Sequence, residues 1–175
     1  DLDGTLLSHA DYSWEAASPA LERLKRIGAG VVMASSKTAA EIGGLRDELG
    51  LAQWKAIVEN GAGLLKPSER NAIDRSIYAQ LRAKLHKIPA SLRTSFLGFG
   101  DMDVAQVSDI TGLSPTAAAL AKERAFSEPG IWSGNDQDKD AFLKALQSLN
   151  IYAREGGRFL TLSFGATKAD QMAQI

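Results

Sequence analysis

The sequence predicts an α/β protein, with a doubly wound core sheet into which a separate α+β module is inserted. Over the first 67 residues, amphipathic helical patterns alternate with short apolar segments, which is the order of elements in a doubly wound sheet. After Lys66 the pattern changes to several helices and one hairpin, which indicates a second module. With 45% hydrophobic residues, the 175-residue chain can bury one large core or two small ones.

The first part of the chain is predicted to begin with a helix and a buried strand. The helix covers 18–28, where Leu21, Leu24 and Ile27 recur at three-residue spacing between charges. The segment AGVVMASSK follows it. It is β-branched and too short for a buried helix, so it is predicted to be a strand.

A second helix and two further strands complete this part. The helix covers 38–50, with Thr38 as its N-cap and Gly50 as its end. The segment KAIVENGAGLLK is predicted to form two short strands joined by a turn at Asn60-Gly61. In doubly wound sheets, ligands bind at the carboxyl ends of the strands, so the site is expected there.

The second part of the chain is predicted to be mostly helical. Helices are predicted over residues 75–88, 104–110, 115–124 and 138–150. Strands at 151–155 and 158–164 form a hairpin through two glycines, and a last helix covers 167–175. The predicted division is therefore 1–67 for the N-terminal part of the core, 68–162 for the inserted module, and 163–175 for the return to the core.

Composition excludes several classes of partner and site. The formal net charge is −1, with 20 lysines and arginines against 21 aspartates and glutamates, which argues against nucleic acid or an anionic membrane as the main partner. The absence of cysteine excludes disulfides and thiolate metal sites, and it is typical of a cytoplasmic protein. No apolar run approaches the roughly 20 residues that span a bilayer.

The string DLDGT contains two carboxylates at alternate positions, Asp1 and Asp3. Mg²⁺ binds such oxygen ligands, usually one or two carboxylates together with phosphate oxygens. An aspartate can also attack phosphorus, and a second acid can protonate the leaving group. A bare pair of this kind is more often a turn on a surface loop, but the full string DLDGTLL favours catalysis.

DLDGT resembles motif I of the haloacid dehalogenase superfamily of phosphotransferases. The resemblance implies that Asp1 is the nucleophile and a metal ligand. It implies that Asp3 is the general acid/base, with its main-chain carbonyl on the metal. Ser35, after an apolar strand, matches motif II, and Lys168, in FGATKADQM, matches motif III. Taken alone, Ser35 could cap a helix and Lys168 could be a solvated surface group, but the three motifs occur in the family's order.

The position of the insertion, after motif II, resembles the C2-capped (Cof-type) branch of this superfamily. Within that branch, the strings SSKT, VENGAGL, TGLS and GGRF resemble the mannosyl-3-phosphoglycerate phosphatases. That likeness implies Mg²⁺-dependent hydrolysis of 2-O-mannosyl-3-phosphoglycerate to mannosylglycerate, a compatible solute, through an aspartyl-phosphate. The expected partner is thus a small phosphorylated sugar or glycerate.

Five residues are candidates for substrate binding: Ser36, Lys37, Asn60, Gly157 and Arg158. Lys37 could add a cation to the phosphate, and Asn60 could hydrogen-bond a sugar or glycerate oxygen. Gly157 could offer a backbone N–H, and the fork of Arg158 could hold the glycerate carboxylate bidentately. The alternative for Gly157 is a tight hairpin turn, and for Arg158 a solvated strand end.

Two departures from the family pattern leave alternatives open. Position 161 is Thr, where the family often has His, so substrate contacts could differ. The acids of motif IV, which complete the metal site, are absent from this sequence, so we expect the rest of the core to lie outside it. The alternatives are a related C2-capped phosphatase for another sugar phosphate, and a catalytically incomplete paralogue that only binds a phosphosugar.

Overall fold

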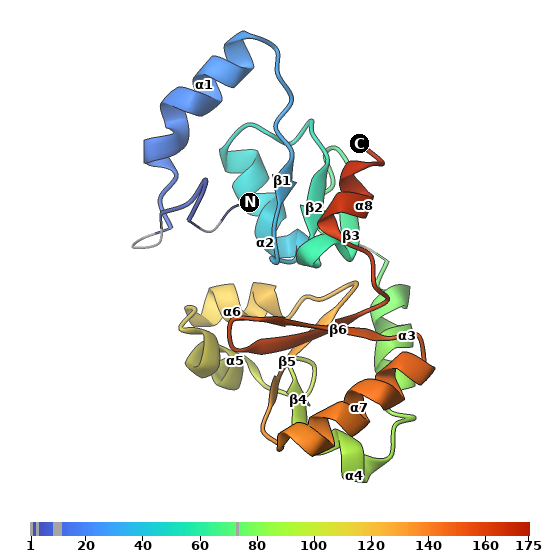
Figure 1. Cartoon of the computed structure of the whole chain (residues 1–175). Coiled ribbons are helices and arrows are strands. Elements are labelled where there is room, and N and C mark those ends of the chain that lie inside the picture. The colour runs from blue at the N-terminus through green and yellow to red at the C-terminus, as the bar shows by residue number, and fades with distance from the viewer. Residues whose placement is uncertain (1, 3, 9–11, 73) are drawn as a thin grey trace.

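The computed structural model describes residues 2, 4–8, 12–72 and 74–175, which form two lobes with one sheet each (Figure 1). The first lobe comprises the described residues up to 72 together with 167–175, and the second lobe comprises 74–164. The sheet of the first lobe has the order β1-β2-β3. β1 is parallel to β2, and β2 is antiparallel to β3. The strands are β1 (Met33–Ala34), β2 (Ala56–Val58) and β3 (Gly63–Leu65).

The helices of the first lobe follow local signals in the sequence. They are η1 (Glu15–Ala17), α1 (Ser18–Arg26), α2 (Ala39–Glu48), η2 (Glu59–Gly61) and α8 (Lys168–Met172). Thr38 is the N-cap of α2, as predicted. Its hydroxyl oxygen accepts from the Glu41 N–H at 3.2 Å, and the Glu41 carboxylate accepts from the Thr38 N–H at 2.8 Å. This reciprocal capping box satisfies two N–H groups that the first turn would leave without partners.

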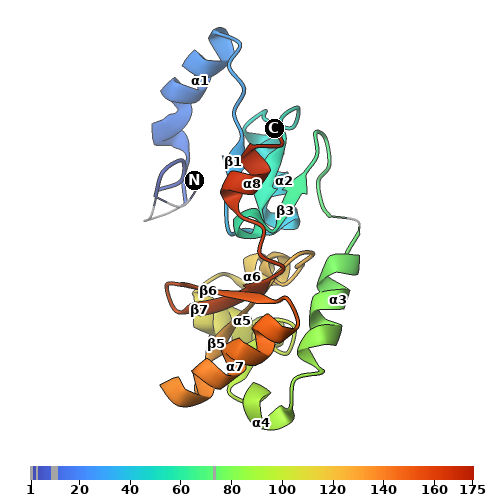
Figure 2. The same ribbon diagram turned by 45° about the vertical axis from the view of Figure 1, so that its right-hand side comes forward.

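Two predicted elements of the first lobe differ from expectation. Of the strand predicted over 29–37, only Met33–Ala34 (β1) forms a regular strand. Helix α1 forms, but it buries no residue, and Ile27 just after it is 69% exposed. The helix extends away from the sheet in both views (Figures 1 and 2). Trp14 ties its N-terminal side to α2, because its indole N–H donates to the Glu48 carboxylate at 2.8 Å.

The second lobe contains an antiparallel sheet in the order β4-β5-β7-β6. The predicted hairpin is confirmed, with Gly156 paired to Phe159 across its turn. The strands are β4 (Phe96–Gly98), β5 (Glu128–Trp132), β6 (Tyr152–Gly156) and β7 (Phe159–Ser163). The helices are α3 (Ser76–Leu85), α4 (Ala90–Arg93), α5 (Val104–Thr111), α6 (Pro115–Ala121) and α7 (Asp136–Ser148). Helix α4 and strands β4 and β5 were not predicted, and α6 ends before Arg124.

Each lobe has its own hydrophobic core. In the first lobe, Leu2, Met33 and Val58 belong to one buried cluster. In the second, Phe142 of α7 packs with Leu160 of β7 and with other apolar residues of the sheet. Figure 1 shows α7 on the side of this sheet that faces away from the first lobe, so the other side faces the first lobe. No helix in the described part of the chain has the length and apolar character needed to cross a bilayer.

Candidate active site

A pocket of about 700 Å³ opens between the two lobes. The first lobe contributes four of the residues proposed from the sequence, namely Ser36, Lys37, Asn60 and Lys168. These residues come from the loop after β1, the turn after β2 and the start of α8. The second lobe contributes residues of the loop before β5 and of the β6–β7 hairpin. The pocket therefore lies at the carboxyl ends of the two parallel strands, where a doubly wound sheet binds its ligands.

Backbone hydrogen bonds join the loop after β1 to the turn after β2. The Ser35 N–H donates to the Ile57 carbonyl at 3.0 Å, and the Asn60 N–H donates to the Ser35 carbonyl at 2.8 Å. The Glu59 N–H donates to the Lys37 carbonyl at 2.9 Å. Ser35 itself is buried, and its hydroxyl oxygen accepts from the Lys37 N–H at 3.2 Å. The motif II hydroxyl thus lies just beneath the pocket wall and orients the residues that form it.

The turn after β2 has an unusual backbone that brings α8 to the pocket. Glu59, Asn60 and Gly61 have φ values of 50°, 59° and 95°, all in the left-handed region. A Cβ on Gly61 would lie 2.1 Å from the backbone nitrogen of Lys168, so only glycine allows this approach. The Gln171 side-chain amide also donates to the Gly61 carbonyl at 3.1 Å. The start of α8, and with it Lys168, is therefore held directly against the turn that carries Asn60.

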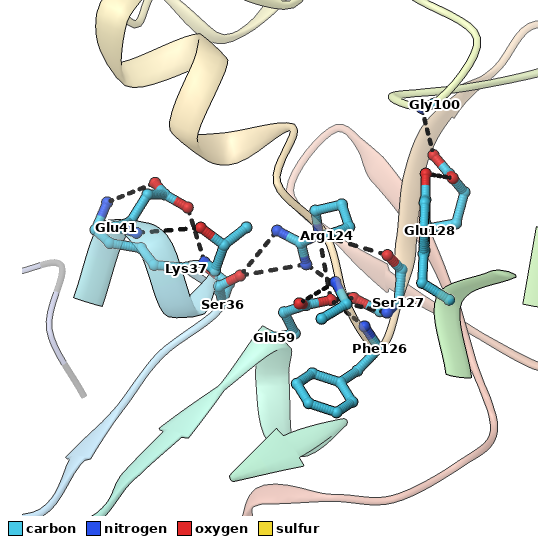
Figure 3. A network of polar contacts seen from close by, with 12 residues as sticks. Ser36, Lys37, Glu41, Glu59, Gly100, Arg124, Phe126, Ser127 and Glu128 are labelled. Atoms are coloured by element: carbon cyan, nitrogen blue, oxygen red, sulfur yellow. Dashed lines mark hydrogen bonds and ion pairs between the residues drawn. The ribbon is translucent and has the colours of Figure 1, made fainter. Parts of the chain in front are cut away.

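A buried ion pair joins the two lobes at the wall of the pocket (Figure 3). Glu59 is 1% exposed, and its carboxylate accepts from the N–H groups of Ala125, Phe126 and Ser127 at 2.7 to 3.2 Å. Arg124 lies 3.3 Å from the same carboxylate, and its guanidinium donates to the Ser36 carbonyl at 3.4 and 3.5 Å. Glu59 of the first lobe therefore anchors the loop before β5, and Arg124 of that loop contacts the segment after β1 in return.

A second buried carboxylate holds the second lobe together behind this wall. Burial raises the pKa of Glu128, although the Tyr78 hydroxyl, the Gly100 N–H and Arg82 all donate to it. Hydrogen bonds from Arg82 lower the pKa of Asp101, and burial raises that of Tyr78 above its usual range. These contacts link α3 to β5, the strand that follows the Arg124 loop, and so hold β5 in position.

The segment that resembles motif I is anchored in the first lobe by its apolar residues. Leu2 and Leu7 are buried in the same cluster as Met33 of β1. Between them, Gly4 has a φ of 72°, and its N–H donates to the Leu7 carbonyl at 2.9 Å. The glycine of the motif thus makes the sharp turn that its residue type permits. Asp1 and Asp3, the proposed nucleophile and general acid/base, lie outside the described residues.

Comparison with known proteins identifies the family. Residues 1–152 match the family model described as haloacid dehalogenase-like hydrolase. The chain belongs to this family. A haloacid dehalogenase-like hydrolase from B. subtilis matches with a TM-score of 0.58 at 16% identity, covering 99% of this chain and 75% of that one. Proteins from Thermotoga maritima and Thermoplasma acidophilum match with TM-scores of 0.61 at 16% identity, covering 99% of this chain and 71% and 67% of theirs. These structures share the fold.

In this hydrolase, the two residues proposed from the GGRF string do not line the pocket. Gly157 is the positive-φ residue of the hairpin turn. Arg158 donates to the Ile110 carbonyl at 2.6 Å, and its guanidinium lies 5.9 Å from the centre of the Phe159 ring. Arg154, on the other strand of the hairpin, lines the pocket instead. The roles given to Gly157 and Arg158 remain predictions.

Arg124 and Arg154 also line the pocket, although no pattern in the sequence pointed to them. Arg154 lies opposite Thr161 because the two-residue turn is Gly157-Arg158 and Gly156 pairs with Phe159. The turn predicted at Gly156-Gly157 would instead have placed Arg154 opposite Phe159. No local pattern points to Arg124, because its role depends on Glu59, more than 60 residues earlier in the chain. The hydrogen bonds of Glu59 with Ala125 and Ser127 likewise span 66 and 68 residues. Long-range pairs of this kind are not encoded in local patterns.

The described residues contain no group of three acidic, histidine or cysteine side chains that could hold a metal ion. Asp1 and Asp3, the metal ligands predicted from the sequence, lie outside the described part. Within the described part, the carboxylates that line the pocket are each paired with a cation: Glu41 with Lys37, Glu59 with Arg124 and Glu155 with Lys139.

Proposed function

We propose that this haloacid dehalogenase-like hydrolase is a Mg²⁺-dependent phosphomonoesterase that acts on 2-O-mannosyl-3-phosphoglycerate in the cytoplasm. The observation that supports it most is the gathering of Ser36, Lys37, Asn60 and Lys168 in one pocket, beside the buried Ser35. The family motifs assign Ser35 and Lys168 to phosphate, while Lys37 could add a cation to it and Asn60 could hydrogen-bond a sugar or glycerate oxygen. A volume of about 700 Å³ is also within the usual range for small-ligand pockets.

The proposed reaction has two steps at phosphorus. A carboxylate oxygen of Asp1 attacks the phosphorus, the ester P–O bond breaks, and Asp3 gives its proton to the departing glycerate oxygen. Asp3 then takes a proton from water, which attacks the phosphorus and releases Asp1 and inorganic phosphate. Ser35 and Lys168 stabilise the charge on the phosphoryl oxygens through both steps.

Asp1 and the main-chain carbonyl of Asp3 would hold the metal ion in this proposal. Hydrolases of this family generally use Mg²⁺, and the ion supplies positive charge that offsets the repulsion between carboxylates and phosphate. Residues 68–162 would then act as the cap, which covers the pocket and reads the leaving group. The anchoring of the 124–127 loop by Glu59 supports a cap held close to the core.

The test is a substrate panel for the full-length protein with Mg²⁺, read as released phosphate. The panel contains 2-O-mannosyl-3-phosphoglycerate, hexose phosphates, a nucleotide and sucrose phosphate. We expect the first to have the highest kcat/KM. A rank below the hexose phosphates would refute this substrate but keep the phosphatase. No turnover of any ester, together with no beryllofluoride adduct on Asp1, would instead favour a protein that only binds phosphosugars.

Two variants test the phosphate-binding roles. Ser35→Ala and Lys168→Met should each lower kcat by roughly 100-fold, the usual effect of removing a donor that stabilises transition-state charge. Lys25→Met, on α1 outside the pocket, is the matched control and should keep the wild-type rate. If Lys168→Met retains the wild-type kcat, the assignment of the late lysine is wrong.

A further inference from the structure

The sheet of the second lobe presents a polar face to the pocket. Along β7, the alternate residues Phe159, Thr161 and Ser163 line the pocket. The residues between them, Leu160 and Leu162, are buried in the core of the second lobe. This alternation follows from the two-residue period of a strand. The face formed by 159, 161 and 163 is therefore one part of the second lobe that a bound ligand meets, in the same pocket as Lys168.

Arg154 extends this face on the neighbouring strand. It pairs directly with Thr161 in the β6–β7 register, so the two side chains project from the same side of the sheet. Arg154 lines the pocket together with Thr161 and Phe159. An arginine, a hydroxyl and an aromatic ring thus lie on one surface opposite the proposed phosphate-binding residues.

The cations of the pocket differ in how they are neutralised. Arg124 is paired with the buried carboxylate of Glu59 at 3.3 Å, and Lys37 lies 4.0 Å from the Glu41 carboxylate. Within the described residues, Arg154 has no carboxylate within 4.0 Å. Hydrogen bonds with Thr167 lower the pKa of Asp170 on α8, and Arg154 is near enough for its charge to add a smaller effect in the same direction. The Arg154 guanidinium donates one long hydrogen bond, to the Gly165 carbonyl at 3.3 Å. Its neighbour Glu155 also lines the pocket, but that carboxylate is paired with Lys139.

We propose that Arg154 binds a second anionic group, a carboxylate on the leaving part of the phosphomonoester. This inference rests on the proposed function and names the residue that recognises the acid group of the leaving alcohol. The planar guanidinium can hold a carboxylate with two parallel hydrogen bonds, and Thr161 can donate a third. Arg158, given this role from the sequence, instead donates to the Ile110 carbonyl.

The experiment compares two esters in the full-length protein: 2-O-mannosyl-3-phosphoglycerate and the same compound with its carboxylate reduced to an alcohol. The wild type should prefer the carboxylate. Arg154→Gln should lower kcat/KM for the carboxylate ester by roughly 10- to 100-fold, the range expected for a lost charge-assisted contact. It should change the value for the alcohol by less than about twofold. Arg154→Lys should restore part of the preference, since it keeps the charge but not the fork.

Arg158→Gln tests the competing candidate, because it removes the same charge from the same hairpin at the residue to which the sequence pattern gave this role. It should leave the preference of the wild type unchanged. An equal loss on both esters in Arg154→Gln, or a selective loss in Arg158→Gln, would overturn the assignment. If the wild type hydrolyses both esters equally well, this inference fails and the phosphatase stands. If it hydrolyses neither ester and no simple phosphomonoester, the proposed function fails and the inference with it.

Discussion

Glu59 shows how one side chain can fix both the backbone of a turn and the contact between two lobes. Its φ of 50° is strained for a residue with a Cβ, and its carboxylate is almost fully buried. The carboxylate accepts three backbone N–H groups and the Ser127 hydroxyl, and it is paired with Arg124. These contacts offset the cost of burying the charge.

Glu59→Gln should therefore destabilise the protein strongly. The amide places an NH₂ group where the carboxylate accepts N–H donors, and it leaves Arg124 buried without its counter-charge. We expect a loss of about 3 kcal/mol in the free energy of unfolding, measured by urea denaturation. Glu155→Gln, which breaks an exposed pair with Lys139, should cost less than about 1 kcal/mol. Equal effects of the two substitutions would contradict the importance of the buried pair.

Asp101 should make stability depend on pH. Hydrogen bonds from Arg82, one of them 3.0 Å long, lower its pKa in the folded state. A lowered folded-state pKa means that stability is gained above the unfolded-state value and lost as the pH falls through the folded-state pKa. Burial raises the pKa of Glu128, so its contribution has the opposite sign, and the two oppose each other on acidification.

Asp101→Asn separates these contributions. Between pH 6 and pH 3, the wild type should lose more unfolding free energy than Asp101→Asn, because the variant has no carboxylate to protonate at this position. Urea midpoints at several pH values measure the difference. Asp140→Asn, at an exposed position on α7, is the control. Parallel pH curves for the wild type and Asp101→Asn would show that the Arg82 contact contributes nothing.

At the scale of elements, the longer helices and the hairpin could be predicted, but the short helix α4 and the strands β4 and β5 could not. Gly98, Pro129 and Gly130 make these strands look like loops. In the structure each glycine allows a close approach. A Cβ on Gly98 would lie 2.6 Å from the Glu128 carboxylate, and one on Gly130 would lie 2.5 Å from the Phe96 ring. The composition of these strands reflects packing between strands that are distant in sequence, which local patterns do not record.

The candidate site was predictable to a similar extent. Ser36, Lys37, Asn60 and Lys168 could be chosen because motif order and strand ends point to them, and all four line one pocket. Arg124 and Arg154 required the tertiary structure. The choice of an arginine on the hairpin depended on the position of the turn, because Arg154 lies on β6 and lines the pocket, whereas Arg158 lies in the turn and does not.

The contact between η2 and α8 gives a prediction about elements. Gly61→Ala combines a left-handed φ with a Cβ that would lie 2.1 Å from the backbone of Lys168, so α8 must move. Gly28→Ala has a similar φ of 68° but no atom within 4 Å. Both should lose about 1 kcal/mol from backbone strain. Only Gly61→Ala should also lose most of its kcat for a phosphomonoester, and a normal kcat would contradict the role of this contact.

At the scale of the whole molecule, the two lobes are linked mainly by polar contacts at the pocket. The Thr38 hydroxyl, which caps α2, donates to the Leu120 carbonyl of the second lobe at 2.9 Å. Glu59 and Arg124 form the buried pair described above, and Phe126 is an apolar side chain of the second lobe that packs on the first-lobe core. Because Glu59 and Arg124 line the pocket, movement of one lobe relative to the other would change the pocket itself.

We expect residues 74–164, the second lobe, to fold without the first lobe. Their sheet is complete in itself, and Phe142, Leu146, Leu160 and Leu162 form a core that involves no residue of the first lobe. We expect the isolated segment to show a cooperative urea transition and native near-UV circular dichroism.

Leu146→Ala should lower the free energy of unfolding of this segment by roughly 2 to 5 kcal/mol, as for other buried leucines. Phe126→Ser should cost much less in the segment, because the core that Phe126 packs on belongs to the first lobe. A segment without a cooperative transition would show that the second lobe needs Glu59 and its neighbours to fold.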